Sequence, residues 1–520
     1  MSTNPAAAVR MLVIYSICIP LAGLVGWLLT DSGNMDYGTL GFFALIAALL
    51  VSPLIIRYHY PLMVFGLGAP IYCFFLKGSP PIWQVVTLLS LGIAIVDRTL
   101  NSEKRFISVP LMTWPLLFTL AVTYGTAELT GGIGLHTLGG NIGGGKKYLS
   151  LFIGIAMYFA LTSRMIPKNQ RGLYTKLFFL AGIPTFVGDL FPFLPSPFNY
   201  INLLIPPTDV AVTGDISLGT TRLGAFAGTA SVIANYMLAR YGLRGILTIS
   251  RPIRLMTFLF MLALTMLGGF RTVVISYLSI CLMLFYLEGL YRTQMSLVLV
   301  MGVLIGGTLA VPFADRLPAT FQRALSFLPL NLDPQVVSEA EGSRKWREDI
   351  WRDVWPKVPQ YLLLGKGYGL TEEDFSMMGT GTFASGAAAQ LDNSLNPLAI
   401  SGDYHNGPLS TLMPFGVWGG IAYLWVSLTV LYVLYRNYRY GDADLKTVNA
   451  FILVSCLQRF LGFFVIFGSY SDDIGTFAKF VGLSVALNWG IRRAPTQARV
   501  TPRIVNRQTP NTPSQTPQPA

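Results

Sequence analysis

Long apolar stretches recur along almost the whole chain, separated by short polar connections. A helix needs about 17–25 mostly apolar residues to cross a bilayer, and about fourteen stretches approach that length. They lie near residues 9–29, 38–56, 61–76, 82–97, 109–127, 148–163, 177–194, 223–239, 255–269, 271–290, 294–312, 408–435, 449–469 and 473–490. This pattern predicts an all-α, polytopic membrane protein with about 12–14 transmembrane helices.

Two segments interrupt the apolar pattern and divide the chain. Residues 313–407 form one long polar connection, a length typical of functional or disordered loops. Residues 494–520 are rich in Pro, Thr and Gln and are predicted to be a disordered tail. We therefore expect about eleven transmembrane helices in 1–312, a large loop in 313–407, and the remaining transmembrane helices in 408–493. The first apolar stretch has no small-residue cleavage site after it and is expected to be a retained anchor.

The composition agrees with a membrane protein. Only 12% of the residues are charged and 52% are hydrophobic, whereas a soluble domain carries about 25% charged residues. The three histidines are far apart, and no CxxC pair occurs, so neither a disulfide framework nor a metal site nor a cofactor is expected. All four cysteines fall inside apolar runs: Cys18, Cys73, Cys281 and Cys456.

The distribution of the positive charge predicts the orientation. Cytoplasmic connections collect Lys and Arg. With the N-terminus placed in the cytoplasm, the inner connections hold most of the Lys and Arg residues that lie in short loops. The outer ones hold only Lys77, Lys146, Lys147, Arg222 and Arg271. Both termini are therefore predicted to be cytoplasmic and the large loop periplasmic. The same asymmetry accounts for the net charge of +12 without nucleic acid.

The large loop contains the run SEAEGSRKWREDIWRDVW, residues 338–355. Its apolar residues recur at helical spacing, which predicts an amphipathic helix with Trp at the headgroup level. Three arginines flank the apolar stripe: Arg344, Arg347 and Arg352. They could pair with Glu348, Asp349 and Asp353 on a solvated face. Alternatively they could form an anion clamp, because guanidinium donors match phosphate oxygens.

Two further motifs lie in the loop. The run LLLGKGYGL predicts a tight turn, but it lacks the strand and helix of a nucleotide-binding loop. His405 stands in DYHNGPLSTLMPFG, where the loop re-enters the membrane. A lone histidine is often structural. An imidazole nevertheless titrates near neutral pH, so His405 is the best candidate for a general base in the chain.

Several charged residues lie at or within predicted spans. Arg222 opens the span with RLGAF, and Arg271 opens the next outer-starting span after GGF. Arginines there either reach toward lipid headgroups or hold an anionic ligand. Arg459 and Lys479 lie deeper and are expected to form structural pairs with acidic residues, the plausible partners being Asp189, Asp472 and Asp473. The glycine-rich stretch 131–148 is interpreted as a flexible outer loop.

The order of these motifs resembles a known family. RLGAF, GGFR, the Arg/Trp helix, the GKGYG turn and HNGPLSTLMPFGVWGG succeed one another over about residues 215–435. This pattern is similar to that of the O-antigen ligase and O-antigen polymerase superfamily, which comprises membrane glycosyltransferases that use undecaprenyl-diphosphate-linked glycans. The earlier part of the chain resembles the family only in being a series of membrane helices.

The resemblance implies a metal-independent glycosyl transfer at the periplasmic face of the bacterial inner membrane. Arg222, Arg271 and one or both of Arg344 and Arg347 would hold the donor diphosphate, and His405 would accept the proton of the acceptor hydroxyl. The implied partners are the lipid-linked glycan donor, a glycan or lipid acceptor, membrane lipid and other proteins of polysaccharide assembly.

Three functions remain open from the sequence. A polymerase would join repeat units of an extracellular or capsular polysaccharide, and we favour it slightly. A ligase would move a finished glycan onto lipid A core. A transporter of lipid-linked sugars is the least favoured, because transporters place their polar groups near the bilayer midplane, often within repeats. In this chain the polar groups gather at one face.

Overall fold

The computed structural model describes residues 37–131, 144–190, 200–207, 222–369 and 404–494, except 77, 102, 104 and 249, and also residues 195, 198 and 402. The predicted first span, most of the glycine-rich stretch 131–148, most of the polar segment before Tyr404 and nearly all of the tail lie outside these residues. Cys18 lies outside them as well, and the other three cysteines are free thiols.

The described residues form helices and short turns, with no β-strand among them. The helices are α2 (Tyr37–Gly66), α3 (Ile82–Leu100), α4 (Pro110–Thr130), α5 (Gly144–Thr162), α6 (Arg171–Leu180), α7 (Val187–Leu190), α8 (Ile201–Leu204), α10 (Gly224–Ile246), α11 (Pro252–Thr265), α12 (Arg271–Leu287), α13 (Met295–Ala310), α14 (Ala319–Leu325), α15 (Pro334–Val354), α16 (Val358–Tyr361), α19 (Leu409–Tyr440), α20 (Lys446–Val465) and α21 (Tyr470–Asn488). The predicted all-α fold is confirmed.

Four helical segments of the described part are long and apolar enough to cross a membrane: Ile82–Leu100, Lys168–Leu190, Leu409–Tyr440 and Ala443–Val465. Pro252–Gly268 and Arg271–Leu287 are shorter apolar helices. Together with the fold these helices identify a polytopic membrane protein, as predicted. The total of 12–14 spans stays a prediction.

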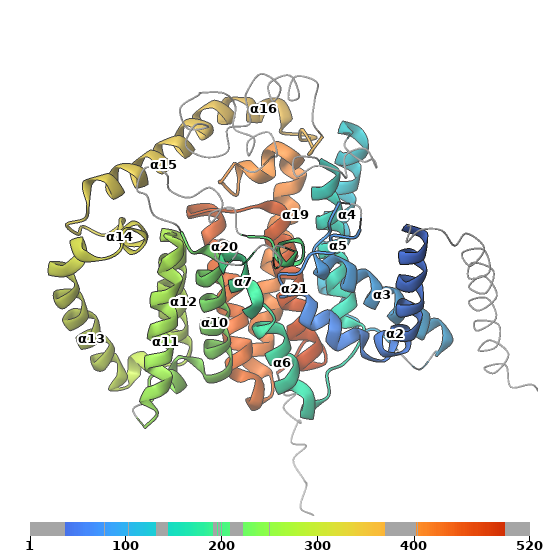
Figure 1. Ribbon diagram of the computed structural model, residues 1–520, viewed down its shortest axis with the longest axis horizontal. Coiled ribbons are helices and arrows are strands. Elements are labelled where there is room, and N and C mark those ends of the chain that lie inside the picture. The colour runs from blue at the N-terminus through green and yellow to red at the C-terminus, as the bar shows by residue number, and fades with distance from the viewer. Residues whose placement is uncertain are drawn as a thin grey trace, which may run out of the picture.

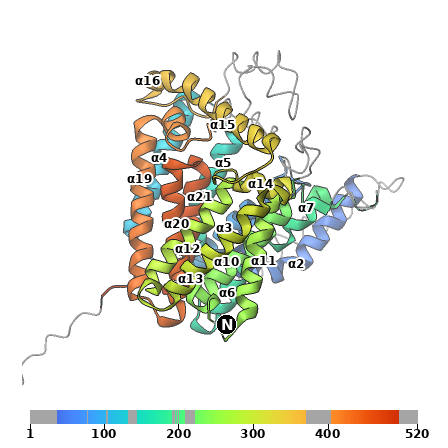
Figure 2. The same cartoon turned by 90° about the vertical axis from the view of Figure 1, so that its left-hand side faces the viewer.

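Helix α21 forms the centre of the bundle (Figures 1 and 2) and packs against α5, α19 and α20. Thirteen of its 19 residues are buried, and Gly475 of α21 meets Gly154 of α5 where these two helices approach closely. α4 packs along α19, and α10 packs between α11 and α20. Buried amides join the helices at one end, where Asn449 and Asn488 exchange hydrogen bonds of 3.1 and 2.9 Å.

Two predicted boundaries are wrong. The sequence predicts separate spans near 38–56 and 61–76, but α2 runs unbroken through Tyr37–Gly66 with Pro53 and Pro61 inside it. The polar residues between the two stretches did not end the helix. The predicted span 177–194 lies mostly within a candidate span that begins earlier, Lys168–Leu190, and that consists of a 3-10 turn, α6, a second 3-10 turn and α7. Pro184 lies in the second turn and has no amide hydrogen to continue a helix.

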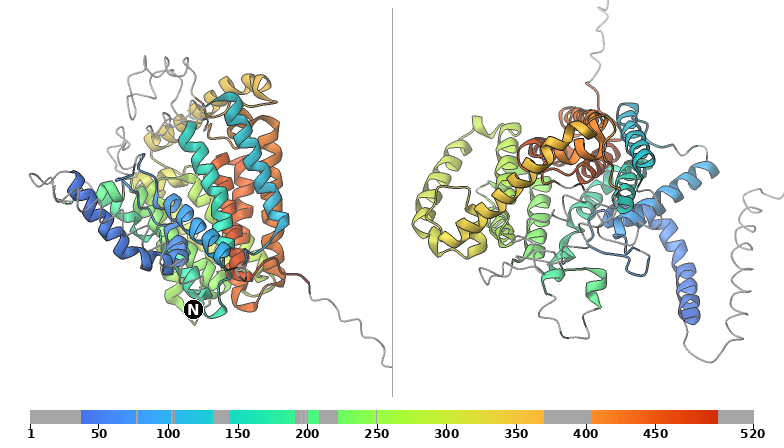
Figure 3. Two further views of the ribbon diagram at one scale, coloured as in Figure 1. Left: turned by 90° about the vertical axis from the view of Figure 1, so that its right-hand side faces the viewer. Right: turned by 90° about the horizontal axis from the view of Figure 1, so that it is seen from above.

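The large loop crosses one end of the bundle, which we name the loop end. α14, α15 and α16 succeed one another across it (Figure 1), and the view from above shows α15 crossing the helices below (Figure 3). α15 begins at Pro334, where the Asp333 side chain accepts a hydrogen bond from the Gln335 amide. The predicted amphipathic helix is therefore present, and it begins before the predicted run 338–355.

A break in α19 receives the GKGYG turn. Pro414 lies inside the helix, and Gly416 has a φ of 59°, so the backbone there leaves the helical conformation. The backbone groups that lose their helical partners at this break bond to the turn instead. The amides of Lys366 and Gly367 donate to the Met413 and Pro414 carbonyls at 2.7 and 2.9 Å. The Val417 amide donates to the Leu362 carbonyl at 2.7 Å. A membrane protein tolerates non-helical backbone where protein pairs it in this way.

The opposite end of the bundle carries a second arginine centre, the Arg171 cluster (Arg171, Lys168, Asp442, Asp444 and Arg492). Arg171 is only 3% exposed, and its Nη1 lies 2.9 Å from Asp442 and 3.0 Å from Asp444. Lys168 and Arg492 lie 3.7 and 3.3 Å from Asp442. These hydrogen bonds and charges, that of Arg171 first, lower the pKa of Asp442. This cluster ties the start of α6 to the connection between α19 and α20.

Candidate functional site

Arg271 begins α12 at the loop end, directly after a glycine turn. Gly269 adopts a left-handed conformation with a φ of 66°, which a residue with a side chain rarely adopts. The turn ends helix α11 and directs Arg271 toward the large loop. There its guanidinium donates a hydrogen bond of 3.0 Å to the Ala340 carbonyl of α15. Arg271 therefore contacts protein and does not simply extend toward headgroups.

Arg222 holds the same glycine turn from the other side. Its Nε and Nη2 both donate to the Gly268 carbonyl, at 2.9 and 2.8 Å, and its guanidinium lies 4.5 Å from the centre of the Phe270 ring. The RLGAF and GGFR motifs are thus in direct contact. A Cβ at Gly269 would meet both Arg222 and Arg323, so these two arginines flank the turn.

Arg323 is an arginine that the sequence analysis did not single out. It lies in the short helix α14, is 16% exposed, and pairs with Glu339 of α15 at 3.1 Å. Its charge acts on both Arg271 and Arg347. The sequence does show Arg323 as a further arginine of the large loop. A helix of only seven residues, however, has too little periodicity to predict which way that side chain faces.

The three arginines of α15 differ from one another. Arg352 is 76% exposed and pairs with Asp349 at 3.2 Å. Arg344 is 68% exposed and lies 3.8 Å from Glu348. For Arg352 the solvated-face interpretation describes the geometry, whereas Arg344 is largely solvated and also lines the cavity described below. Arg347 turns inward: its Nε is buried and has no hydrogen-bond partner among the described residues. Burial, followed by the charges of Arg271 and Arg323, lowers the pKa of Arg347.

A cavity of about 560 Å³ lies beneath α15, between α12 and α20. Three arginines line its loop end, Arg271, Arg344 and Arg347. From there the lining continues along one face of each helix, with residues spaced three and four apart. α12 contributes Thr272, Ile275, Ser279 and Met283, and α20 with its end contributes Gln458, Leu461, Gly462, Val465 and Ile466. The cavity therefore combines a cationic end with a mostly apolar channel.

The channel extends well into the bundle. Arg271 and Met283 are separated by twelve helical positions, which at about 1.5 Å per residue is about 18 Å. Gln458 is the polar side chain that α20 contributes to the lining, and its amide donates to Ser276 at 2.9 Å. Gln458 was also missed from the sequence. A polar residue inside an apolar span is the signal that could have marked it.

His405 lies beside this cavity but is not among the residues that line it. Its ring packs 5.5 Å from Trp346 of α15 and 5.1 Å from Phe467, between ring centres. Trp346 precedes Arg347, and Phe467 comes directly after Ile466 of the lining. His405 also has a φ of 49°, a left-handed conformation that is strained for a residue with a side chain.

The backbone around His405 is fixed on both sides. The Trp351 indole donates to the Tyr404 carbonyl at 2.8 Å, and the Asn406 side chain accepts from the Leu409 amide at 3.1 Å. A Cβ on Gly407 would lie 2.3 Å from the Phe463 carbonyl, so only glycine allows this close approach to α20. The strained position of His405 is thus held by its neighbours, as is common for residues in functional sites.

The remaining sequence-based expectations have mixed outcomes. Arg459 pairs with Asp473, so that structural pair is present as predicted. Asp189 instead accepts a hydrogen bond from the Phe226 amide at 2.9 Å. Within the described residues, no group of three or more His, Cys, Asp or Glu side chains gathers as a metal site would require.

The structure thus brings Arg271, Arg344 and Arg347 to one cavity, with His405 beside it. Arg222 does not line the cavity; it contacts Gly268 in the glycine turn that precedes Arg271. The five predicted residues therefore lie at one end of the bundle, although they come from segments up to 183 positions apart.

Comparison with known proteins covers this region. None of the curated proteins matches the chain. Residues 256–424 match the model of a protein family described as O-Antigen ligase. The matched segment begins in α11, contains α12, α15 and the GKGYG turn, and ends within α19. It includes Arg271, Arg344, Arg347 and His405 but not Arg222. The resemblance read from the sequence is thereby confirmed over residues 256–424, which match the O-antigen ligase family.

Proposed function

We propose that this chain is a membrane glycosyltransferase of surface polysaccharide assembly that polymerises undecaprenyl-diphosphate-linked repeat units. The observation that carries the proposal is the cavity beneath α15, which has guanidinium groups at one end and an apolar channel behind them. A lipid diphosphate has the same two parts. In the proposed orientation the cavity opens near the periplasmic face of the inner membrane, and both termini are cytoplasmic.

The charges at the cavity favour an anion with more than one negative charge. Glu339 pairs with Arg323, and Glu348 lies at the exposed Arg344, while Arg271 donates to a backbone carbonyl and Arg347 is partly buried. A diphosphate would supply acceptors for these guanidinium groups. Such charge-assisted hydrogen bonds strengthen as negative charge develops on the leaving group.

His405 is proposed as the general base. The acceptor hydroxyl oxygen would form a bond to the anomeric carbon of the donor sugar while its proton passes to the His405 imidazole. The bond between the anomeric carbon and the diphosphate oxygen would break, and the lipid diphosphate would leave with the electron pair. The arginines would stabilise that leaving group, and His405 would stand on the side from which the acceptor approaches.

A ligase that transfers a finished glycan to lipid A core is the second candidate, and the family description favours it by name. The donor lipid and the proposed roles of the arginines and His405 are the same for both reactions. They differ in the acceptor, which no contact at the cavity identifies.

The test compares two arginines of α15 in cells that lack the native gene. Arg347→Ala removes the inward guanidinium, and Arg352→Ala removes the exposed one five residues later. Loss of one charge-assisted hydrogen bond costs about 1.5–3 kcal/mol, so Arg347→Ala should lower polysaccharide synthesis about 10- to 150-fold. Arg352→Ala should stay within about twofold of the native chain. Equal activity of both variants at equal protein level would contradict the proposed function.

The accumulated material separates the two candidates. In cells with Arg347→Ala, single lipid-linked repeat units are expected to accumulate if the chain is a polymerase. Full-length lipid-linked polymer that does not reach lipid A would identify a ligase instead.

A further inference from the structure

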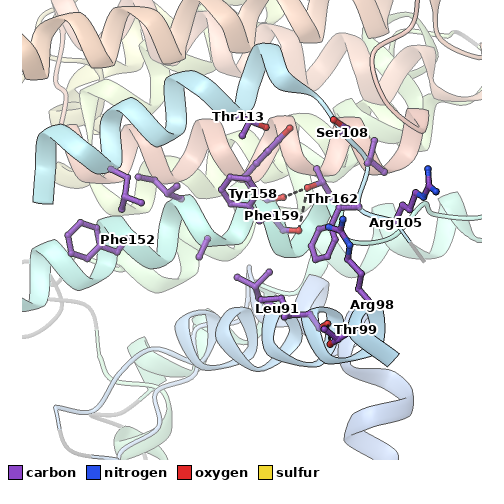
Figure 4. Close-up of a pocket in the computed structure, with 16 residues that line it drawn as sticks. Leu91, Arg98, Thr99, Arg105, Ser108, Thr113, Phe152, Tyr158, Phe159 and Thr162 are labelled. Atoms are coloured by element: carbon purple, nitrogen blue, oxygen red, sulfur yellow. Dashed lines mark hydrogen bonds between the residues drawn. The ribbon is translucent and has the colours of Figure 1, made fainter. Parts of the chain in front are cut away.

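A second cavity, distant from His405, lies between α3, α4 and α5. It has a volume of about 810 Å³ and is lined by sixteen residues, which Figure 4 draws as sticks. Its apolar wall comes from Leu91 and Ile95 of α3, Leu120 of α4, and Phe152 and Phe159 of α5. Arg98 and Arg105 lie together at one end of it, while Phe152 lies at the other (Figure 4).

This cavity belongs to the end of the bundle opposite the loop end. Its basic end includes Thr162, the last residue of α5, whose carbonyl accepts a hydrogen bond from the Ile107 amide at 2.9 Å. A few residues on, Ile166 pairs with Ala486 near the end of α21. His405 packs near the start of that helix, and the 19 residues of α21 span about 28 Å. The cavity beneath α15 and the cavity between α3, α4 and α5 are therefore separate sites.

The two arginines are available to an anion. In the part of the chain that the structure describes, neither Arg98 nor Arg105 forms an ion pair, and both side chains are exposed. Arg98 lies 5.5 Å from the centre of the Phe106 ring, which holds it near the cavity. The neighbouring carboxylates along the chain are Asp97 and Glu103, and neither lines the cavity. Asp97 accepts a hydrogen bond from the Asn101 side-chain amide at 3.1 Å.

A third cavity, also basic, adjoins the cavity between α3, α4 and α5. This third cavity has a volume of about 570 Å³. Phe106, Ile107 and Ser108, in the connection between α3 and α4, line both cavities and separate them. Its lining includes Arg436 and Arg493. Four arginines thus surround one short connection at the level where the charge asymmetry predicts the cytoplasmic headgroups.

The apolar part has the depth of one leaflet. Phe152 to Thr162 covers ten helical positions, about 15 Å, and half of a hydrocarbon core of about 30 Å is also about 15 Å. Leu88 and Ile95 of α3 are half exposed, so the helix beside the cavity presents an apolar surface to the membrane. An acyl chain could therefore reach the cavity from the bilayer.

We propose that this cavity binds an anionic glycerophospholipid of the adjacent leaflet. The phosphate is held by Arg98 and Arg105, and an acyl chain lies along Ile95, Phe152 and Phe159. Basic pockets between transmembrane helices recognise anionic headgroups in this manner. The lipid would fill the space between α3 and the bundle and thereby hold α2 and α3 against α5.

The test measures lipid adducts on the full-length protein by native mass spectrometry, with phosphatidylglycerol and phosphatidylcholine as probes. The native chain should bind phosphatidylglycerol more tightly. Each arginine near the surface contributes about fivefold to such binding, so the double variant Arg98→Ala with Arg105→Ala should bind it about 25-fold more weakly. The matched control, Arg251→Ala with Arg292→Ala, removes the same charge at exposed positions that line neither cavity.

A second variant tests the cavity itself. Ala156 lines it, so Ala156→Phe should fill the space and weaken phosphatidylglycerol binding at unchanged charge. The proposal is overturned if the control pair weakens binding as much as Arg98→Ala with Arg105→Ala, which would indicate general surface charge. It is also overturned if Ala156→Phe binds as the native chain does, or if phosphatidylcholine or an undecaprenyl phosphate binds more tightly than phosphatidylglycerol.

Discussion

The two ends of the bundle each gather arginines, but they satisfy them differently. At one end, Arg171 is almost fully buried and contacts two carboxylates within 3.0 Å. At the loop end, Arg271 donates to a backbone carbonyl, and no carboxylate forms an ion pair with Arg347 among the described residues. A structural arginine has its counter-charge within the fold. An arginine held among other arginines is suited to a charge that arrives with a ligand.

The largest effect should come from the loop end and leave the fold unchanged. His405→Ala removes the proposed base, and general-base catalysis contributes about 10²–10⁴-fold, so glycosyl transfer should fall by that factor. Protein level and melting temperature should not change. His59→Ala is the matched control, because His59 contacts Ser90 within the bundle. Polysaccharide yield per molecule of protein provides the measurement, and equal yields for the two variants would exclude His405 as the base.

Arg171→Met should lower stability and leave transfer activity unchanged, the opposite of His405→Ala. It leaves Asp442 and Asp444 close together without their shared cation, and loss of one partner from a buried pair costs about 3–5 kcal/mol. Because the aspartates are partly exposed, we expect about 3 kcal/mol, the lower end of that range. The melting temperature and the yield of folded protein should fall, while transfer per folded molecule is retained. A normal melting temperature would show that the Arg171 cluster is not structural.

Arg347→Met sharpens the comparison by applying the same change at the loop end. Replacing a buried, poorly paired charge with an apolar side chain of similar volume is often neutral or stabilising, so we expect the free energy of unfolding to rise by about 1 kcal/mol while activity is lost. Thermal unfolding of Arg347→Met and Arg171→Met in the same detergent gives the answer. Shifts of the same sign would remove the distinction between the two ends.

The smallest effect concerns pH. The pKa of Asp442 is lowered in the folded protein, first by its hydrogen bond to Arg171. Its contribution to stability is therefore present above the ordinary pKa of about 4 and is lost as the pH falls below it. The melting temperature should decrease as the pH is lowered below about 4, and less so in Asp442→Asn. An identical decrease in Asp442→Asn would assign the effect to other groups.

The sequence was sufficient for those parts of the site that are local. The helix at 338–355, the turn at Gly365 and Gly367, and the loop position of His405 can be read from spacing and residue type. The spacing did not show which arginine of α15 faces inward, because that depends on how α15 packs over the cavity that Arg271, about 75 positions earlier, also lines. Arg323 was missed for the same reason, since its importance comes from its position beside Arg271 and Arg347.

The helix boundaries show the same limit. Pro414 and Gly416 are residues typical of a helix break. The turn that bonds to this break lies about 50 residues earlier, so no local pattern predicts that the two meet. In α2, two prolines are tolerated inside one helix, so local rules for ending a helix did not apply.

The seating of the GKGYG turn in the break of α19 restricts how the cavity can be filled. Lifting α16 and the turn away from α19 would leave the Met413, Pro414 and Leu362 carbonyls and their donors without partners, at several kcal/mol for each group in a lipid environment. That end of the covering helix therefore acts as a fixed anchor rather than a lid. Under the proposed function, a lipid-linked donor would therefore enter sideways from the bilayer and lie along the α12 and α20 residues that line the cavity, with its polar head beneath α15.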